Sequence, residues 1–215
     1  MQRKGGLVRA KSNFRAAEAE LRGNKVRNRA IRAPHCLGSE YRASLTSMQS
    51  EHLLHTIDPV FDARSRVLLL GSFPSPKSRE IGFFYGHPQN RMWRVLTAVT
   101  GEGAVPQTTE ERTAFLLRNR IAMWDVIASC TIEGASDASI RDVVPNDLSR
   151  ILDIAPIEAV FCTGGKSHQL YRRYQEPATG ISAVKLPSTS GANASWSLER
   201  LVGAYRAVAK ALKQD

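Results

Sequence analysis

Residues 67–71, Val67-Leu68-Leu69-Leu70-Gly71, form a continuous apolar run that ends in a glycine. A strand that is buried on both faces of a parallel sheet has this pattern, because neither of its faces meets water. Three similar runs follow along the chain, at Ile121–Ile127, Ala159–Cys162 and Ala183–Leu186. We therefore predict four buried strands.

Helical segments separate the predicted strands. They span Asn90–Thr97, Thr109–Arg118, Asn146–Ile154, Lys166–Tyr174 and the amphipathic Leu198–Leu212. Thr108 and Glu111 have the spacing of a capping box, which marks the start of the second helix. Strands that alternate with helices predict a parallel sheet with helices on both faces. The sequence from Arg66 to Asp215 is thus expected to form one α/β domain.

The carboxyl ends of these strands are the expected place for a ligand, because open parallel sheets bind ligands beyond that edge. The loops concerned begin at Gly71, Ala128, Thr163 and Pro187. The first loop runs to Trp93 and contains three consecutive aromatics followed by His, Gln, Asn and Arg. Such a segment suits a planar base, since stacking on an aromatic side chain contributes about 1–3 kcal/mol. We predict that this loop carries the chemistry, with two of its aromatics in the core and one exposed.

Two further polar segments each admit two interpretations. His87, next to Pro88, either caps the helix that follows or takes part in catalysis and binding. The segment Leu186–Trp196 is rich in hydroxyl groups, and its backbone amides and serines suit a phosphate group. The same residues also suit the simpler task of capping the last helix.

Composition excludes several classes of protein. The chain has 215 residues, of which 42% are hydrophobic and 23% are charged, as in ordinary soluble domains. No apolar run approaches the roughly 20 residues of a membrane helix. Cys36, Cys130 and Cys162 lie far apart without a CxxC motif, which excludes a disulfide framework and a four-cysteine metal site. We expect a cytoplasmic protein that holds no metal ion.

The net charge of +10 lies mainly in an N-terminal tail. Residues 1–47 contain 11 of the 30 Lys and Arg but only 3 of the 20 Asp and Glu, which leaves 19 and 17 for residues 48–215. We predict a basic, disordered tail over residues 1–47 and a folded domain over residues 48–215. The tail is interpreted in three ways: a basic arm that adds affinity for phosphates, an organellar transit segment, or untranslated sequence ahead of a start at Met48. The charge is therefore weak evidence about the domain.

One motif points to a different class of protein. Thr163-Gly164-Gly165-Lys166-Ser167 resembles the end of a phosphate-binding P-loop, but the complete motif requires glycine where Val160 stands. Nucleotide hydrolysis is therefore disfavoured. A non-catalytic module that binds nucleotides or DNA is kept as an alternative.

Three separated motifs carry a resemblance to a known family. They are Gly71-Ser72-Phe73-Pro74, then Tyr85-Gly86-His87-Pro88-Gln89-Asn90 followed by Trp93, and then Leu186-Pro187-Ser188-Thr189-Ser190 with Ala192-Asn193-Ala194. They resemble motifs of the uracil-DNA glycosylase superfamily, most closely those of its hypoxanthine-DNA (deoxyinosine) glycosylase branch, as does the segment from Trp124 to Asp137. The resemblance covers about residues 66–212. It implies a three-layer α/β/α fold around a four-stranded parallel sheet, and the excision of damaged bases from DNA.

The resemblance also implies a set of site residues. Mismatch-specific uracil glycosylases place a water-orienting Asn where Phe73 stands here, whereas the hypoxanthine branch uses the Asn of a His-Pro-x-Asn motif, which falls on Asn90. Asn90 is therefore the expected catalytic residue. The residues expected to bind the base are Ser72, Phe73, Tyr85 and His87, and those expected to bind DNA are Ser188, Thr189, Ser190, Ala192, Asn193 and Lys166.

Some of these assignments keep a simpler alternative. Asn193 is also typical of a turn, and Lys166 of the solvated start of a helix. The chain departs from the branch at Phe73, Ser75 and Gly191, where Met, Gly and Pro are usual, and these changes bear on the shape of the pocket and the range of substrates.

The predicted function is that of a monofunctional DNA glycosylase in base excision repair, acting chiefly on hypoxanthine. Uracil, or a G·T or G·U mismatch, is the alternative substrate. Such an enzyme flips the target nucleotide out of the duplex, at a cost of a few kcal/mol that a mispaired base lowers. We expect it to act on damaged DNA as a monomer, without a metal ion or an organic cofactor.

Overall fold

The computed structural model describes residues 50–134 and 136–213. The predicted tail, residues 1–47, lies outside the described residues. The described part begins with β1 (Ser50–Leu54), which precedes the first strand expected from the sequence. Among the described residues, every helix is too short or too polar to span a bilayer.

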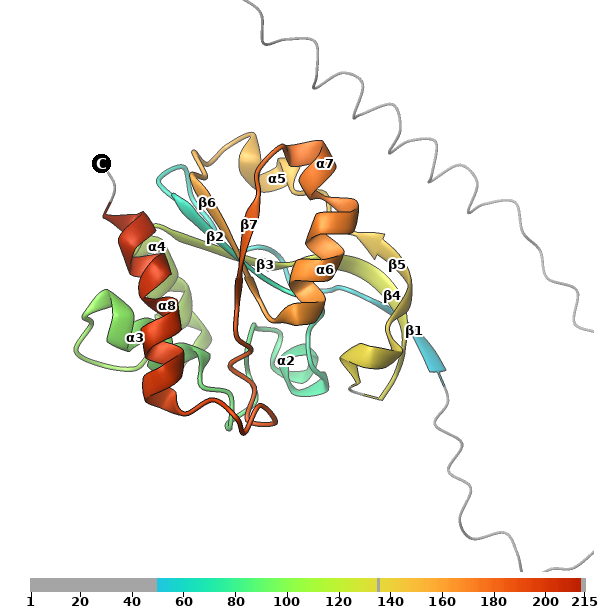
Figure 1. Cartoon of the computed structure of the whole chain (residues 1–215), viewed down its shortest axis with the longest axis horizontal. Helices are drawn as coiled ribbons and strands as arrows, with labels where there is room; N and C mark the ends of the chain where they lie inside the picture. Colours follow the sequence, from blue (N-terminus) through green and yellow to red (C-terminus); the bar gives the residue numbers. More distant parts are fainter. Residues whose placement is uncertain (1–49, 135, 214–215) are drawn as a thin grey trace, which may run out of the picture. The chain divides into compact units, whose positions relative to one another are not determined.

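A four-stranded parallel sheet forms the centre of the fold (Figure 1). Its strands are β2 (Val67–Gly71), β3 (Ile121–Asp125), β6 (Ala159–Thr163) and β7 (Ala183–Leu186), in the order β3-β2-β6-β7. All five residues of β2 and of β3 are buried, as the continuous apolar runs predicted. The prediction of a buried strand is wrong for β7, in which only Leu186 is buried, because β7 lies at the edge of the sheet. The register places Gly71 beside Asp125, so the carboxyl ends of β2 and β3 coincide.

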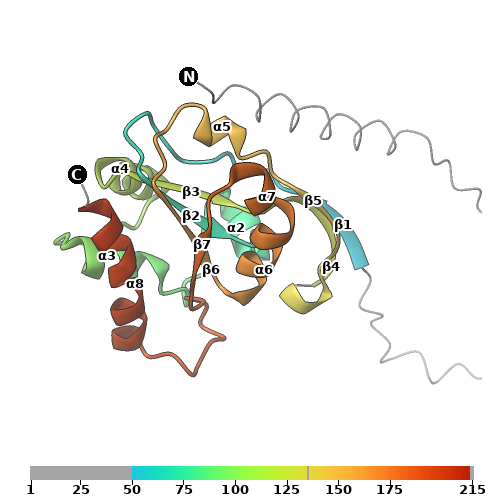
Figure 2. The same ribbon diagram turned by 45° about the horizontal axis from the view of Figure 1, so that its top comes forward.

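Helices cover both faces of this sheet, which confirms the three-layer α/β/α arrangement. Figures 1 and 2 show α3 (Met92–Thr100), α4 (Thr109–Arg118) and α8 (Leu198–Leu212) on one side, and α6 (Gly165–Tyr174) with α7 (Glu176–Thr179) on the other. Two short helices, α2 (Pro76–Ile81) and α5 (Ser149–Leu152), were not predicted with these bounds.

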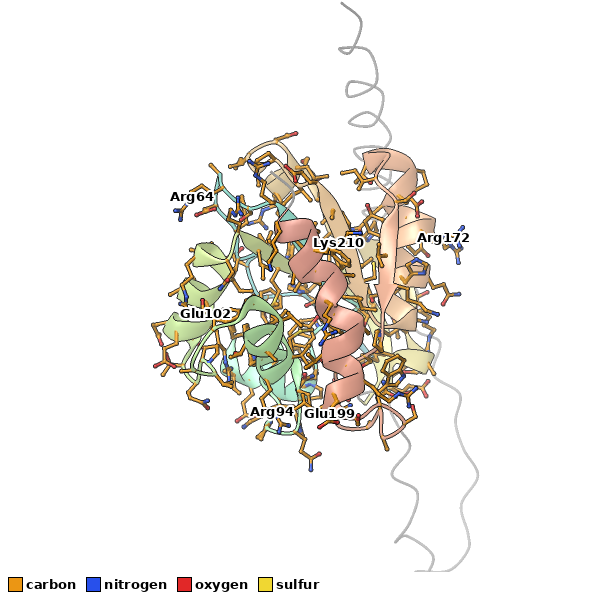
Figure 3. The ribbon with its side chains drawn as sticks, turned by 60° about the vertical axis from the view of Figure 1, so that its left-hand side comes forward. Arg64, Arg94, Glu102, Arg172, Glu199 and Lys210 are labelled. Atoms are coloured by element: carbon orange, nitrogen blue, oxygen red, sulfur yellow. The ribbon has the colours of Figure 1, made fainter. Side chains whose placement is uncertain are left out.

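Local sequence signals set the ends of several helices. The capping box of α4 is present as predicted: the Thr108 side chain accepts from the Glu111 backbone amide, and the Glu111 carboxylate accepts from the amide of Thr108. Ser197 caps α8 in a similar way through Arg200 N. Figure 3 shows α8 with Lys210 on its outer face, and Arg94 and Glu199 at the end of the molecule where α3 and α8 begin.

The predicted strand Ile121–Ile127 is wrong in its extent. The parallel strand β3 ends at Asp125, and β4 (Ile127–Glu133) continues into a second, antiparallel sheet with the order β1-β4-β5, where β5 is Arg141–Pro145. The backbone carbonyls at the break bond side-chain amides instead of a parallel neighbour. Asn146 Nδ2 donates to the carbonyls of Asp125 and Ile127, at 2.9 and 3.1 Å, and Gln175 Nε2 donates to that of Val126 at 3.2 Å.

The predicted helix Asn146–Ile154 is also shorter than expected. Only Ser149–Leu152 is helical. Asn146 is buried and its side chain holds the break between β3 and β4, so its backbone follows β5 and not a helix. Here a tertiary contact overrides the helical propensity of the sequence.

Candidate active site

A pocket of about 200 Å³ opens at the carboxyl ends of the parallel strands. It is lined by the ends of β2, β3 and β6, by α2 and by the segments after β2, β4 and β7; the polar lining residues include Ser72, Asn90, Asp125, Asp137, Thr163, Ser188 and Ser190. Pockets for drug-sized ligands measure about 300–1,000 Å³. This pocket therefore suits a single planar heterocycle, and it lies where the loop from Gly71 was predicted to bind a ligand.

Tyr85 forms one wall of the pocket. Its neighbours Phe83 and Phe84 are buried in the core, as predicted for two of the three aromatics, whereas Tyr85 is half-buried and not exposed. Its hydroxyl bonds Thr163 Oγ1 at 2.7 Å, and Thr163 Oγ1 in turn donates to the Leu70 carbonyl at 3.2 Å. The Tyr85 hydroxyl is therefore the donor of the first bond, because Thr163 has only one hydrogen to give.

The backbone and ionisation of Tyr85 are also constrained. Its φ of 50° lies in the left-handed region, which a residue with a large side chain rarely adopts. Burial raises its pKa well above the usual value, and the charge of Asp125 acts in the same direction. The phenol is thus neutral at ordinary pH, and its ring is fixed as a surface on which a base could stack.

Asn90 lines the pocket and is half-buried, two residues before α3. Its Oδ1 accepts from the backbone amide of Met92 at 3.0 Å and from Thr189 Oγ1 at 2.8 Å. A backbone amide can donate only to the oxygen of the side chain, so these bonds fix the orientation of the amide group. The Nδ2 group, with its two hydrogens, is the part of Asn90 that remains for a ligand.

Arg91 holds the segment after β7 against this site. Its guanidinium donates to the backbone carbonyls of Thr189, Ser190 and Asn193, at 3.3, 2.8 and 3.0 Å, and to that of Trp196. Its backbone amide donates to Thr189 as well, at 3.0 Å. One cation therefore binds four carbonyls within the eight-residue segment from Thr189 to Trp196, which holds this loop in one conformation.

Comparison with known proteins identifies the family. Residues 59–212 match the model of the Uracil DNA glycosylase superfamily, which is more than half of the chain. The chain belongs to this superfamily. It is 33% identical over 141 residues to a protein of Methanosarcina acetivorans named "Hypoxanthine DNA glycosylase", covering 66% of this chain and 89% of that protein. A protein of Methanosarcina barkeri with the same name is 37% identical over 139 residues, covering 63% of this chain and 85% of the relative.

A solved structure supports the same assignment. The solution NMR structure of a candidate uracil DNA glycosylase from Methanosarcina acetivorans has a TM-score of 0.64 and 31% identity, and the match covers 74% of this chain and 98% of that chain. The predicted family, fold and enzyme class, a DNA glycosylase, are thereby confirmed.

The superfamily motifs do not all reach the pocket of this glycosylase. Ser72 and Phe73 line it, and Ser72 Oγ donates to Asp137 Oδ2 at 3.1 Å. His87 is exposed and is not among the lining residues, and its Nδ1 accepts from Gln89 N at 3.2 Å. This contact favours the local role that the sequence left open for His87.

Only some residues of the hydroxyl-rich segment after β7 line the pocket. Ser188 and Ser190 line the pocket, but Thr189 is only 1% exposed and its hydroxyl serves Asn90. This placement differs from the DNA contact predicted for Thr189. Asn193 donates from Nδ2 to the Ser188 carbonyl at 2.8 Å and accepts from Ser195, as a turn residue does, while Ala192 is exposed.

Lys166, near the start of α6, lies close enough to Asp137 for its charge to affect the pKa of that carboxyl group. Much of Asp137 is exposed, yet partial removal of the carboxyl group from water raises its pKa, against the effects of the Ser72 hydrogen bond and of Lys166. Within the described ranges, no group of three or more His, Cys, Asp or Glu has an arrangement that could hold a metal ion.

Two polar residues of the site were not singled out from the sequence. Asp125 lines the pocket, and its Oδ2 bonds His55 Nε2 at 2.9 Å. The expected strand end at Ile127 concealed Asp125, since the loop was placed two residues too late. His55 belongs to no periodic segment and bonds a residue 70 positions away, so no local signal reveals it.

Proposed function

We propose that this glycosylase excises hypoxanthine from DNA as a monofunctional enzyme. Two relatives that carry the name "Hypoxanthine DNA glycosylase" span most of the domain. Phe73 supports the same choice. Mismatch-specific uracil glycosylases resemble one another in having Asn at this position, whereas Phe73 has no side-chain amide. A pocket of about 200 Å³ is of the right scale for one flipped base.

The observation that carries the proposal is the fixed amide of Asn90. Since Oδ1 is occupied by Met92 and Thr189, Asn90 would act through Nδ2 as a donor. In that role it holds the oxygen of a water molecule beside the sugar carbon, with a lone pair of the water free to attack. Precise placement of this kind supplies much of the rate of an enzyme, and here helix α3 and the segment after β7 provide it.

The reaction separates charge, and the pocket has groups suited to this. As the glycosidic bond breaks, its electron pair leaves with the base, and the sugar carbon becomes positive. The water oxygen bonds to that carbon, and the proton that the water loses is taken up by the departing base, directly or through solvent. Fixed dipoles around the departing base favour this change without reorganising. Tyr85 would stack on the base while backbone groups of Ser72 and Phe73 meet its edge.

The DNA strand would run past the mouth of the pocket. Ser188 and Ser190 lie there, and we propose that they contact the flanking phosphates together with Lys166. The turn formed by the exposed Ala192 and the half-buried Asn193 would enter the gap that the flipped nucleotide leaves in the stack. Thr189 would act indirectly, by holding Asn90.

Oligonucleotide duplexes that carry inosine, uracil, xanthine or a G·T mismatch test the proposal. We expect hypoxanthine to be released far faster than uracil. Asn90→Ala and Asn90→Asp should both lose excision by at least about 100-fold, because neither offers the amide hydrogens, while binding to the lesion duplex is retained. Asn90→Asp is the sharper variant, since it keeps an acceptor for Met92 and Thr189. Full activity of either variant, or faster release of uracil, would refute the assignment.

The reaction is also proposed to need neither a metal ion nor an organic cofactor, and the protein is proposed to act as a monomer. Excision of hypoxanthine in the presence of EDTA tests the first statement. Sedimentation at the concentrations used for catalysis tests the second.

A further inference from the structure

Asp125 is a carboxylate at the floor of the base pocket. It is the last residue of β3, is only 4% exposed, and stands beside Gly71 in the parallel register. Asn90, by contrast, also lines the pocket but is half-buried, as are Ser188 and Ser190. A flipped nucleotide enters with its base first, so Asp125 lies where the edge of the base arrives and Asn90 lies near the sugar.

His55 fixes the position of this carboxylate. The His55 side chain is only 2% exposed, and its ring meets those of Phe73 and Trp124 edge-on, with centroids 5.9 and 6.2 Å apart. The backbone amide of Ile57 donates to His55 Nδ1 at 3.3 Å, so Nδ1 is without a hydrogen and Nε2 carries one. His55 therefore donates to Asp125 Oδ2, which must be an acceptor.

The second oxygen of Asp125, Oδ1, lies against the backbone of Gly71. A methyl group built on Gly71 would lie 2.1 Å from Asp125 Oδ1 and 3.2 Å from the Tyr85 hydroxyl. Only glycine at position 71 thus leaves room for the carboxylate beside the base pocket. Asp125 lines the pocket, so an N–H or O–H group of a ligand in the pocket can donate a hydrogen bond to its carboxylate.

We infer that Asp125 accepts a hydrogen bond from N1–H of hypoxanthine and thereby distinguishes the deaminated base from adenine, with His55 as its positioning residue. The inference rests on the function proposed above. Deamination replaces the 6-amino group of adenine by an oxygen and places a hydrogen on N1. Adenine would present the lone pair of N1 to the carboxylate, and a site built to bind an N–H group rejects an analogue without it by about 10⁴-fold or more.

The same chemistry limits what Asp125 can select. Xanthine and guanine also carry N1–H, so Asp125 can accept a hydrogen bond from either base. Guanine in a normal duplex is protected by its stable pairing with cytosine, which raises the cost of flipping it out.

Asp125→Asn gives a directional test. The carbonyl oxygen of the new amide must face His55 Nε2–H, which turns the NH2 group toward the base. That group opposes N1–H of hypoxanthine and suits N1 of adenine. Inosine or deoxyadenosine is placed opposite an abasic analogue, so that base pairing does not contribute, and single-turnover excision is measured for the full chain.

The expected result is that the wild-type protein releases hypoxanthine and leaves adenine, whereas Asp125→Asn loses at least about 100-fold of its hypoxanthine-to-adenine ratio. An unchanged ratio overturns the inference and leaves the proposed function intact. A wild-type protein that does not release hypoxanthine overturns both.

Two further measurements hold even if Asp125→Asn does not fold. Wild-type protein should release hypoxanthine much faster than unsubstituted purine, whose N1 has a lone pair; equal rates overturn the inference. His55→Ala should lower the hypoxanthine-to-adenine ratio and His55→Gln, which keeps an N–H donor, should restore it. The control His52→Ala changes an exposed residue of β1 and should leave the ratio unchanged. A purely structural role of His55 would lower both rates equally and so contradict its positioning role.

Discussion

Gly71→Ala is the smallest change that should disable the pocket while leaving the fold in place. The added Cβ would lie 2.1 Å from Asp125 Oδ1, whereas real Cβ contacts are essentially never shorter than 3.0 Å. The carboxylate must therefore move by the difference, 0.9 Å. The Tyr85 hydroxyl, 3.2 Å from the same point, limits the directions of this movement, and the bond from His55 opposes it.

The expected cost follows from that displacement. A misplacement of about 1 Å in an active site can lower the rate about 100-fold. This corresponds to about 2.7 kcal/mol of transition-state stabilisation, because each factor of ten is about 1.36 kcal/mol. Overfilling a well-packed region costs about 1–3 kcal/mol of folding stability. We therefore expect a folded protein with a lower melting temperature and excision of hypoxanthine slowed about 100-fold.

Single-turnover excision from an inosine duplex, with thermal unfolding of the same samples, measures both effects. The matched control is Gly203→Ala, because Gly203 is an exposed residue within α8 where an added Cβ meets nothing within 4 Å. That variant should gain about 0.5–1 kcal/mol of stability and keep its excision rate. If Gly71→Ala excises hypoxanthine at the wild-type rate, the carboxylate is not held as the structure implies and the reasoning fails.

Two further predictions concern Arg91, which holds the segment after β7, and Thr108, which caps α4. Arg91→Met should weaken binding to lesion DNA at least tenfold in a fluorescence anisotropy titration, because hydrogen bonds from a charged group contribute about 1.5–3 kcal/mol each and this side chain orders the segment from Thr189 to Trp196. Arg172→Met, on the outer surface of α6 in Figure 3, should bind as the wild type does, and equal losses in both variants would count against the role of Arg91. Thr108→Ala should lower the stability by about 1 kcal/mol through loss of the capping box of α4, with no change in excision. A slower reaction in that variant would show that α4 affects the site.

The sequence by itself determined the sheet and the side of it that carries the site. The apolar run Val67–Leu70 identifies a strand buried on both faces, because burial of both faces leaves no place for polar residues. The run Ala183–Leu186 also forms a parallel strand, but at the edge of the sheet, where two of its residues are exposed. The order of strands and helices then fixes the edge at which loops meet a ligand. Local signals worked equally well at α4, where Thr108 and Glu111 form the predicted capping box.

Tertiary structure alone decided which atoms of the site are available. Whether β3 ends at Asp125 or Ile127 depends on Asn146 and Gln175, whose side chains bond the backbone at the break. Asn90 was predicted from a motif, but the direction of its amide depends on Thr189, 99 residues away. The pairing of His55 with Asp125 spans 70 residues. Sequence periodicity reports which faces of an element are buried, whereas hydrogen bonds between distant segments are fixed only when the packed elements bring their partners within about 3 Å.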